Sequence, residues 1–171
     1  MLGRLIVTAD VHGRYATWQV IRSMVKKDDI LVVAGDLFDT RYGRLGPDFR
    51  PQTIKEEATA LGDRFHYVYG NCDVPAFCPG YHYELEFTYS GINILLIHGH
   101  APIANLPRHT NLVIQGHTHV PKLEKKEKFV HFNPGSLAVP RVKAFTYGIV
   151  ENNRATLMDF TTNTPLFWID L

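Results

Sequence analysis

The sequence predicts an α/β fold in which two mixed β-sheets pack face to face and are flanked by helices. Residues 5–69 alternate short apolar runs with amphipathic segments, which is typical of parallel strands joined by helical crossovers. Residues 83–169 contain many short β-branched and aromatic runs separated by turn signals, which indicates a largely β second half. The length of 171 residues suits one domain, so we expect a single domain over residues 1–171.

In the first half, we expect strands at residues 5–8, 30–34 and 65–69 and helices at residues 14–27 and 52–64. The first helix is predicted from Trp18, Ile21, Met24 and Val25, which recur at helical spacing. Each strand stops at a glycine or a polar residue. Because open α/β sheets bind ligands at the carboxyl ends of their strands, these stops are candidate site positions.

In the second half, the strands are expected at residues 83–89, 92–97, 112–115, 122–124, 129–132, 146–150, 155–160 and 165–169. Ser90-Gly91 and Asn152-Asn153 are hairpin turn signals. Residues 40–51, which carry Gly and Pro, are predicted to form an irregular insertion loop in the first half.

The charge balance excludes some partners. With 18 Lys and Arg against 17 Asp and Glu, the chain lacks the basic excess that tight nonspecific binding to duplex nucleic acid or an acidic membrane requires. No apolar run approaches the roughly 20 residues that span a bilayer, and residues 1–10 do not resemble a secretory signal. Two cysteines make a poor disulfide framework. We therefore expect a cytoplasmic protein without a membrane partner, and a homo-oligomer is left open.

Five short polar motifs each follow an apolar strand. They are Asp10-Val11-His12-Gly13, Gly35-Asp36-Leu37-Phe38-Asp39, Gly70-Asn71-Cys72-Asp73, His98-Gly99-His100 and Gly116-His117-Thr118-His119. If the backbone is extended, the two side chains of each pair separated by one residue point the same way. A single His or Asp in such a place is more often a turn cap than a ligand, but the full set in this order indicates one metal site.

The candidate ligands are carboxylates, imidazoles and one amide: Asp10, His12, Asp36, Asn71, His98, His117 and His119. These groups suit Mn²⁺, Zn²⁺, Fe²⁺, Co²⁺ or Ni²⁺, with Mn²⁺ the first choice for assays. Seven ligands are too many for one tetrahedral zinc. They suit two ions that share a carboxylate, with a bridging water or hydroxide that attacks a phosphodiester.

The motifs resemble the calcineurin-like metallophosphoesterase superfamily, whose pattern runs D-x-H, G-D-x-x-D, G-N-x-[DE], H and G-H-x-H. The chain is most similar to the compact YfcE-like phosphodiesterases, and residues 132–136 also match the N-P-G-S turn of that group. This group also includes a protein-trafficking subunit of retromer. The resemblance implies a four-layer α/β/β/α sandwich and a hydrolase for a small phosphodiester, with a nucleotide-derived substrate left open.

The resemblance also implies roles for individual residues. It places Asp10, His12, Asp36 and His119 around one metal. It places Asn71, His98 and His117 around the other, with Asp36 as the bridge. Outside these ligands, Asp39 either orients a ligand imidazole or caps the following segment, and Asp73 is a second supporting candidate.

The sequence departs from most of the superfamily at Cys72, where a histidine usually helps to neutralise the phosphate and protonate the leaving group. General acid catalysis contributes roughly 10²–10⁴ in rate, so we expect a slow enzyme that prefers good leaving groups. His100 is the candidate substitute, and we include it with Asp36 and Asn71 as catalytic candidates. The alternative for His100 is a structural histidine.

The insertion loop carries Arg41, Tyr42, Arg44, Phe49 and Arg50. A guanidinium group pairs well with phosphate, so Arg41 and Arg44, together with Cys72, are the candidate substrate-binding residues. A solvated basic face is the plainer alternative. Two rival functions are a noncatalytic interaction scaffold, as in the retromer subunit, and a nuclease, which the neutral charge balance disfavours.

Overall fold

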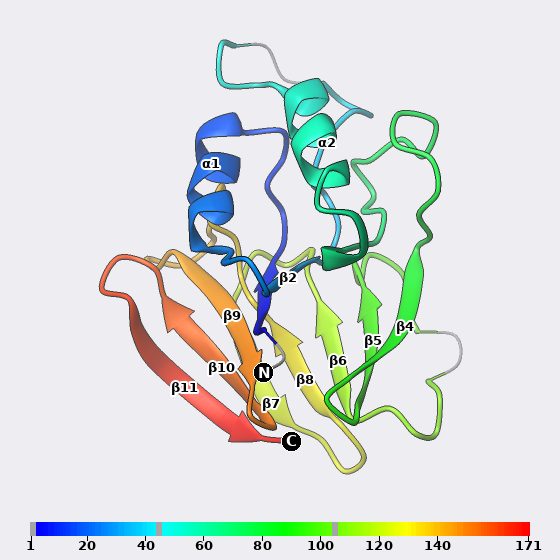
Figure 1. Ribbon diagram of the computed structural model, residues 1–171, viewed down its shortest axis with the longest axis vertical. Coiled ribbons are helices and arrows are strands. Elements are labelled where there is room, and N and C mark those ends of the chain that lie inside the picture. Colours follow the sequence, from blue (N-terminus) through cyan, green and yellow to red (C-terminus); the bar gives the residue numbers. More distant parts are fainter. Residues whose placement is uncertain (1–2, 44–45, 104–105) are drawn as a thin grey trace.

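A computed structural model describes residues 3–43, 46–103 and 106–171 (Figure 1). The elements in chain order are β1 (Leu5–Thr8), α1 (Tyr15–Met24), β2 (Ile30–Val33), α2 (Pro51–Thr59), a 3₁₀ turn (Gly62–Arg64), β3 (Phe65–Tyr67), β4 (Glu84–Tyr89), β5 (Ile92–Ile97), β6 (Leu112–Gln115), β7 (Lys122–Lys125), β8 (Val130–Asn133), β9 (Thr146–Glu151), β10 (Arg154–Asp159) and β11 (Thr164–Asp170). Every predicted strand has its counterpart here.

The strands form the predicted pair of mixed sheets. The first sheet has the order β11-β10-β9-β1-β2-β3, and the second has the order β4-β5-β6-β8-β7. β1, β2 and β3 are parallel, as the alternation of strands and helices predicts. β5, β6 and β8 are likewise parallel in the second sheet. Each sheet also contains antiparallel pairs, so both sheets are mixed and the predicted fold class is confirmed.

Two apolar layers hold the first sheet in place. Its inner face packs on the second sheet through a core that includes Val7, Val32 and Leu96. Its outer face is covered by both helices, with Trp18 of α1 and Ile54 of α2 fully buried. Figure 1 shows these two helices side by side at one end of the molecule.

The outer face of the second sheet is covered differently. There Leu95, Ile97 and Val113 pack against Ile103, Leu106 and Phe129. Between β5 and β6, the described part of the chain contains loop rather than helix, so the outermost layer on this side is irregular.

Both predicted helices end early. The helix predicted at residues 14–27 stops at Met24, because Val25 is already extended, and the helix predicted at residues 52–64 stops at Thr59. Pro51 begins α2 at a position where a missing N–H costs nothing. Gly62 then adopts a φ of +57°, which a continuing helix does not allow, and the segment finishes as a 3₁₀ turn.

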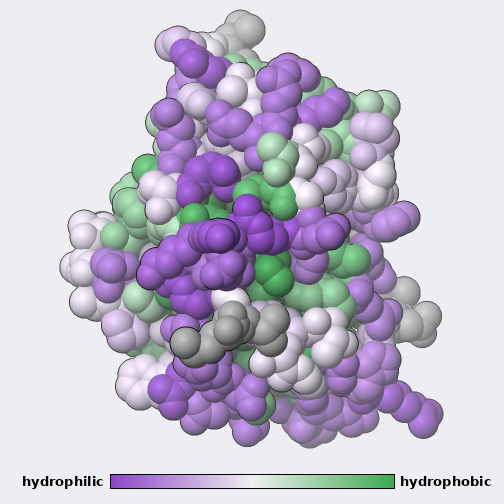
Figure 2. All heavy atoms as spheres, in the orientation of Figure 1, coloured by the Kyte–Doolittle hydropathy of each residue, from purple (hydrophilic) through white to green (hydrophobic). Residues whose placement is uncertain are grey.

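The face of the molecule in Figure 2 is largely hydrophilic, with hydrophobic patches between the polar side chains. Within the described residues, no helix combines the length and hydropathy needed to cross a bilayer.

Candidate metal centre

The polar motifs follow the carboxyl ends of β1, β2, β3, β5 and β6, where the chain turns sharply. Six motif residues other than glycine have a positive φ: Asp10, His12, Asp36, Asp39, His117 and His119. The backbone through the paired ligands is therefore not extended, so the condition under which the paired side chains would point the same way is not met. A left-handed conformation costs an ordinary residue about 1–2 kcal/mol, so surrounding contacts must hold these turns in place. One such contact is the hydrogen bond from His12 N to Asp36 O at 2.8 Å, which joins the loops after β1 and β2.

A first cluster contains Asp10, His12 and His119, which are all buried and have candidate ligand atoms within 4.8 Å of one another. His12 Nδ1 lies 3.2 Å from Asp39 Oδ2, and His119 Nδ1 lies 2.7 Å from Val139 O. A carboxylate or a carbonyl oxygen accepts but does not donate, so each Nδ1 carries the proton and each neutral ring has its lone pair on Nε2.

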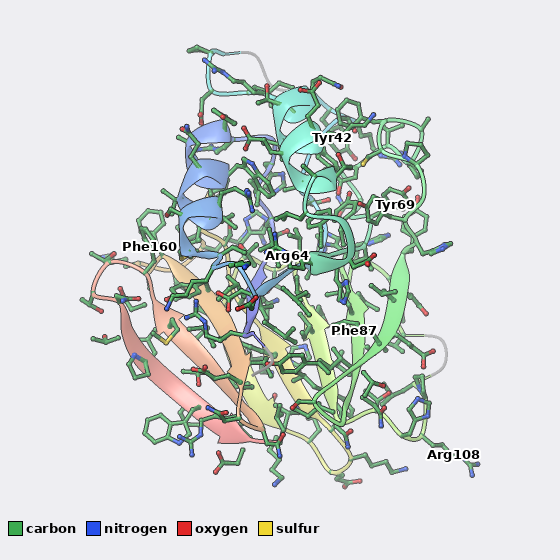
Figure 3. The ribbon with its side chains drawn as sticks, in the orientation of Figure 1. Tyr42, Arg64, Tyr69, Phe87, Arg108 and Phe160 are labelled. Atoms are coloured by element: carbon green, nitrogen blue, oxygen red, sulfur yellow. The ribbon has the colours of Figure 1, made fainter. Side chains whose placement is uncertain are left out.

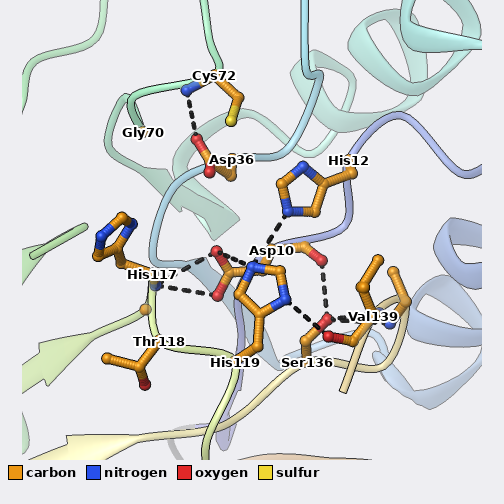
Figure 4. A network of polar contacts seen from close by, with 12 residues as sticks. Asp10, His12, Asp36, Gly70, Cys72, His117, Thr118, His119, Ser136 and Val139 are labelled. Carbon is orange, nitrogen blue, oxygen red and sulfur yellow. Dashed lines mark hydrogen bonds and ion pairs between the residues drawn. The ribbon is translucent and has the colours of Figure 1, made fainter. Parts of the chain in front are cut away.

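Those two Nε2 atoms lie only 3.3 Å apart (Figure 4). Two lone pairs facing each other at this distance repel, unless a proton or another cation lies between them. His119 Nε2 also lies 3.4 Å from Asp10 Oδ1, which adds a negative charge to the same point. Imidazole and carboxylate donors that converge in this way fit a divalent metal ion.

A second cluster repeats this arrangement around His98. Its Nδ1 donates to Ala34 O at 2.8 Å, which leaves the lone pair of the neutral ring on Nε2. That Nε2 faces two further acceptors, Asn71 Oδ1 at 3.1 Å and Asp36 Oδ2 at 3.2 Å. Asp10, Asp36 and His98 form a group within metal-ligand reach. These converging donors also fit a divalent cation.

Asp36 belongs to the second cluster and also approaches His12 of the first. Its Oδ1 accepts the backbone N–H of Cys72 at 2.8 Å. Burial would raise its pKa, but the hydrogen bond and charge of His98 outweigh burial and lower the pKa to about 2. The carboxylate is thus ionised at neutral pH. Gly70 lies so close that a Cβ there would overlap Asp36 Oδ1, which explains why this motif needs glycine.

His117 lies at the edge of the second cluster. Its backbone N–H donates to both carboxylate oxygens of Asp10, at 3.0 and 3.2 Å. Its half-buried ring has its centroid 5.0 Å from that of His98. The structure therefore brings all seven candidate ligands to one place, and their assignment to particular ions is a proposal.

Two buried acids support the clusters. Asp39 contacts the His12 ring, the arrangement expected if it orients an imidazole.

Asp73 accepts three consecutive backbone N–H groups, from residues 37–39, at 3.2, 2.9 and 3.1 Å. It also accepts the backbone N–H of Gly70 at 3.1 Å and the hydroxyl of Tyr67 at 2.6 Å. Asp73 thus fastens the loop of Asp36 and Asp39 to the loop that carries Asn71. Tyr69, labelled in Figure 3, donates to Cys78 O at 2.8 Å and closes the same loop from its far side.

The N-P-G-S turn has a role that the sequence did not reveal. Ser136 Oγ donates to Asp10 O at 2.9 Å, and Asn133 Nδ2 donates to Gly116 O at 2.7 Å. Val139, just past the turn, supplies the carbonyl that holds His119 (Figure 4). The turn therefore supports both the Asp10 loop and the His119 loop. The motif itself was the available signal, but its partners are distant in sequence.

His100, the candidate substitute for the missing histidine, lies at the mouth of the site. His100 is exposed, with its ring centroid 5.5 Å from that of His98 and 6.4 Å from that of His117. It lines a cavity of about 250 Å³ with Tyr83 and His98. Burial, followed by the charges of His98 and Arg41, lowers its pKa. His100 therefore lies beside the His98 side of the site.

Both described ends of the insertion loop contact the motif loops, and at the far end the backbone N–H of Arg50 donates to Gly13 O at 2.9 Å. Arg41 is exposed, and its backbone N–H donates to Cys72 O at 2.9 Å. Tyr42 (Figure 3) is 71% exposed. Arg50 turns away and places its guanidinium 5.3 Å from the centre of the Tyr15 ring. Arg44 lies outside the described residues.

Cys72 is half-buried beside Asp36. Burial, together with the negative charge of Asp36, raises the pKa of its thiol far above the usual range. In the metal-free chain the side chain is thus a neutral thiol. It does not supply the positive charge that a histidine could carry at this position.

Comparison with known proteins identifies the family. The model of the calcineurin-like phosphoesterase superfamily domain matches residues 4–155. This chain belongs to that superfamily. The match includes every candidate ligand, and it makes the chain a member of a family of phosphoester hydrolases.

The similarity to relatives covers nearly the whole length of this chain. The Escherichia coli phosphodiesterase YfcE is 27% identical over 163 residues, covering 88% of each chain. A probable metallophosphoesterase of Mycoplasma pneumoniae is 25% identical over 182 residues, covering 95% of this chain and 98% of the relative. The solved structure of YfcE superposes with a TM-score of 0.80 at 22% identity, covering 98% of each chain. Vacuolar protein sorting 29 from Cryptosporidium parvum shares the fold, with a TM-score of 0.66 at 13% identity over 99% of this chain and 98% of that one.

Proposed function

We propose that this phosphoesterase is a metal-dependent phosphodiesterase whose two clusters hold two divalent ions. The observation that supports it most directly is that the Nε2 atoms of His12 and His119 lie only 3.3 Å apart in the first cluster. The Nδ1 proton of each ring is donated to another oxygen, so both Nε2 lone pairs point into the cluster. Histidines that only cap turns would not be expected to place their Nε2 atoms together. The second cluster, where His98 Nε2 faces Asn71 and Asp36, supports a second ion.

The chain's residues fit this task. The first ion would be held by Asp10, His12 and His119, and the second by Asn71, His98 and His117, with Asp36 shared. Divalent ions there would supply positive charge for phosphoryl oxygens and lower the pKa of a water molecule. The low pKa of Asp36 keeps its carboxylate charged, so it can attract both ions at neutral pH.

The residues at the mouth suit a phosphate ester. Arg41 offers a guanidinium that pairs with phosphate oxygens, and His100 lies beside the second cluster. Cys72 lacks the positive charge with which a histidine would bind a doubly charged monoester. We therefore propose a diester, with one negative charge and an aryl or other good leaving group, as the preferred substrate. The similarity to a protein named phosphodiesterase supports this choice.

The test is hydrolysis of bis(p-nitrophenyl) phosphate and p-nitrophenyl phosphate by metal-stripped protein after each ion is added back. Mn²⁺, Zn²⁺, Fe²⁺, Co²⁺ and Ni²⁺ are compared at equal concentration. We expect no turnover without metal and faster hydrolysis of the diester with it. Asp36→Asn should lower kcat/KM for the diester by at least roughly 10²–10³-fold, the range for loss of one electrostatic contact in an active site. The matched control is Asp63→Asn, because Asp63 is exposed and lies on the 3₁₀ turn.

A noncatalytic scaffold is the alternative, favoured by the thiol at position 72 in place of the superfamily's usual histidine. On that account the protein binds metal but hydrolyses neither ester at a rate that depends on Asp36. Metal-dependent turnover that Asp36→Asn abolishes and Asp63→Asn leaves intact would exclude the scaffold as the sole function.

A further inference from the structure

The thiol of Cys72 has a fixed position inside the candidate metal centre. The backbone N–H of Cys72 donates to Asp36 Oδ1 at 2.8 Å, which ties this residue to the shared carboxylate. Asn71 Nδ2 donates to Cys72 Sγ at 3.3 Å, so the sulfur already acts as an acceptor for a neighbouring site residue. Figure 4 shows the sulfur beside Asp36, on the side where His12 lies.

The distances allow the sulfur and the first cluster to share one ion. Cys72 Sγ, a ring nitrogen of His12 and a carboxylate oxygen of Asp36 all lie within 4.8 Å of one another. Metal–nitrogen bonds of about 2.1 Å and metal–sulfur bonds of about 2.3 Å place two donors on opposite sides of an ion roughly 4.4 Å apart. A small side-chain rotation is therefore enough to bring all three donors into one coordination sphere.

Two features of the surroundings favour a cation at this point. His12 and Asp36 are almost completely buried, at 5% and 2% exposure, so water screens the converging charge poorly. The Nε2 atom of His12 also faces that of His119 at 3.3 Å with both Nδ1 protons committed elsewhere. These contacts would stabilise a cation on this side independently of the cysteine.

We propose that Cys72 is an additional ligand of the ion in the first cluster and gives the centre a preference for thiophilic cations such as Zn²⁺ and Cd²⁺ over Mn²⁺. This inference rests on the proposed function only because it requires that cluster to bind metal. On binding, the S–H bond breaks, its proton leaves to solvent and a sulfur–metal bond forms, without any change of oxidation state. Soft sulfur ligands select soft or borderline metals, whereas carboxylates suit Mn²⁺.

Cobalt(II) spectroscopy separates the two proposals. Co²⁺ held by histidines and carboxylates gives visible d–d bands, and a thiolate ligand adds a sulfur-to-cobalt charge-transfer band in the near ultraviolet. We expect both signals from the metal-stripped protein after Co²⁺ is added. Cys72→Ser, which replaces sulfur by oxygen, should remove the charge-transfer band and retain the visible bands. Cys78→Ala is the matched control, because Cys78 is the second cysteine of the sequence and is buried in the same apolar core as Ile54 and Ala58 of α2.

A second measurement gives the size of the preference. By competition titration, Cys72→Ser should weaken Cd²⁺ binding at least roughly tenfold more than Mn²⁺ binding, whereas Cys78→Ala should change neither ratio. Visible bands without a charge-transfer band in the parent protein would overturn the thiolate ligand and leave the metal centre standing. Absence of both signals would overturn the metal centre itself. A charge-transfer band that survives in Cys72→Ser would assign it to another sulfur and also overturn the inference.

Discussion

The inner and outer halves of the site are built differently. The inner half consists of Asp36 and of His12, His98 and His119, and each of these rings donates its Nδ1 proton to a fixed oxygen of the fold. The outer half consists of Arg41, His100 and His117. Within the described residues, the rings of His100 and His117 make no hydrogen bond, and Arg41 and His100 are exposed. The fold thus fixes the inner ligands in advance, whereas a bound metal would orient His117, and Arg41 and His100 are left to meet solvent or substrate.

The largest expected effect is that of Gly70→Ala, which tests whether the inner half is rigid. The added Cβ would overlap Asp36 Oδ1, so the carboxylate or the whole loop must move. We expect a stability loss of about 1–3 kcal/mol, as for overpacking elsewhere, and at least a hundredfold loss of diesterase activity. Urea unfolding and steady-state kinetics measure the two effects.

Gly43→Ala in the outer loop is the matched control for this change. A Cβ there meets open space, although the φ of +62° still disfavours alanine by about 1 kcal/mol. We expect near-normal kinetics. Equal loss of activity in the two variants would contradict the difference in rigidity between the halves.

The next effect concerns the partner of an inner histidine. Asp39→Asn keeps the size of the side chain but removes the charge that faces His12 Nδ1. Loss of such a partner weakens metal binding by roughly 10–100-fold, and we expect a decrease in this range for Mn²⁺ by isothermal titration calorimetry. Affinity within twofold of the parent protein would show that Asp39 only caps its own turn.

The pKa values of the histidines should distinguish the inner half of the site from the outer half. The hydrogen bond to Asp10 raises the pKa of His119, and that of His98 is also raised because Asp36 outweighs burial. Burial and the charge of His98 lower the pKa values of His100 and His117. In metal-free protein, NMR should therefore give two values above and two below the ordinary 6.5. Four values on one side of it would remove the electrostatic distinction.

The raised pKa values of His98 and His119 also make the stability of the fold depend on pH. Because the pKa values of His98 and His119 are raised in the folded state, protonation of these rings stabilises the metal-free fold below about pH 6.5. This stabilisation is lost as the pH rises through the folded-state pKa values. Because ligand histidines must be neutral, metal affinity should fall as the pH falls through the same raised values. With metal bound, His98 should stop titrating while His100 continues.

The smallest effect is expected at the exposed edge. Arg41→Ala should raise KM for the diester severalfold and leave kcat almost unchanged, because an exposed guanidinium contributes binding rather than chemistry. Arg108→Ala is the control, since Arg108 projects from a loop distant from the site in Figure 3. A KM unchanged by Arg41→Ala would remove Arg41 from the substrate site. A large fall in kcat would instead place it in the catalytic machinery.

The sequence predicted every strand because strand formation follows local apolar patterns, such as residues 30–34 and 92–97. It also predicted which side chains gather at the sheet edge, since parallel strands place their carboxyl ends together. The end of α2 was missed because Gly62 acts through its backbone conformation. The loop cover of the second sheet follows from tertiary packing of Ile103 and Leu106, which no local period reveals.

The supporting contacts of the site were harder to predict for a related reason. Ser136 and Asp10 are 126 residues apart in the sequence, and Val139 is joined to His119 through a backbone carbonyl that any residue could supply. The positive φ values of Asp10 and His12 are imposed by hydrogen bonds to the next loop. Patterns of residue type identify the ligands, whereas the geometry that aims them depends on contacts between distant segments.

Anomalous diffraction from crystals soaked in Mn²⁺ tests the central claim most directly. We expect two peaks per chain, roughly 3.5–4 Å apart as in other two-metal sites. One should lie beside the Nε2 atoms of His12 and His119, the other beside His98, with Asp36 between them. A single peak, or two peaks that do not share Asp36, would contradict the account.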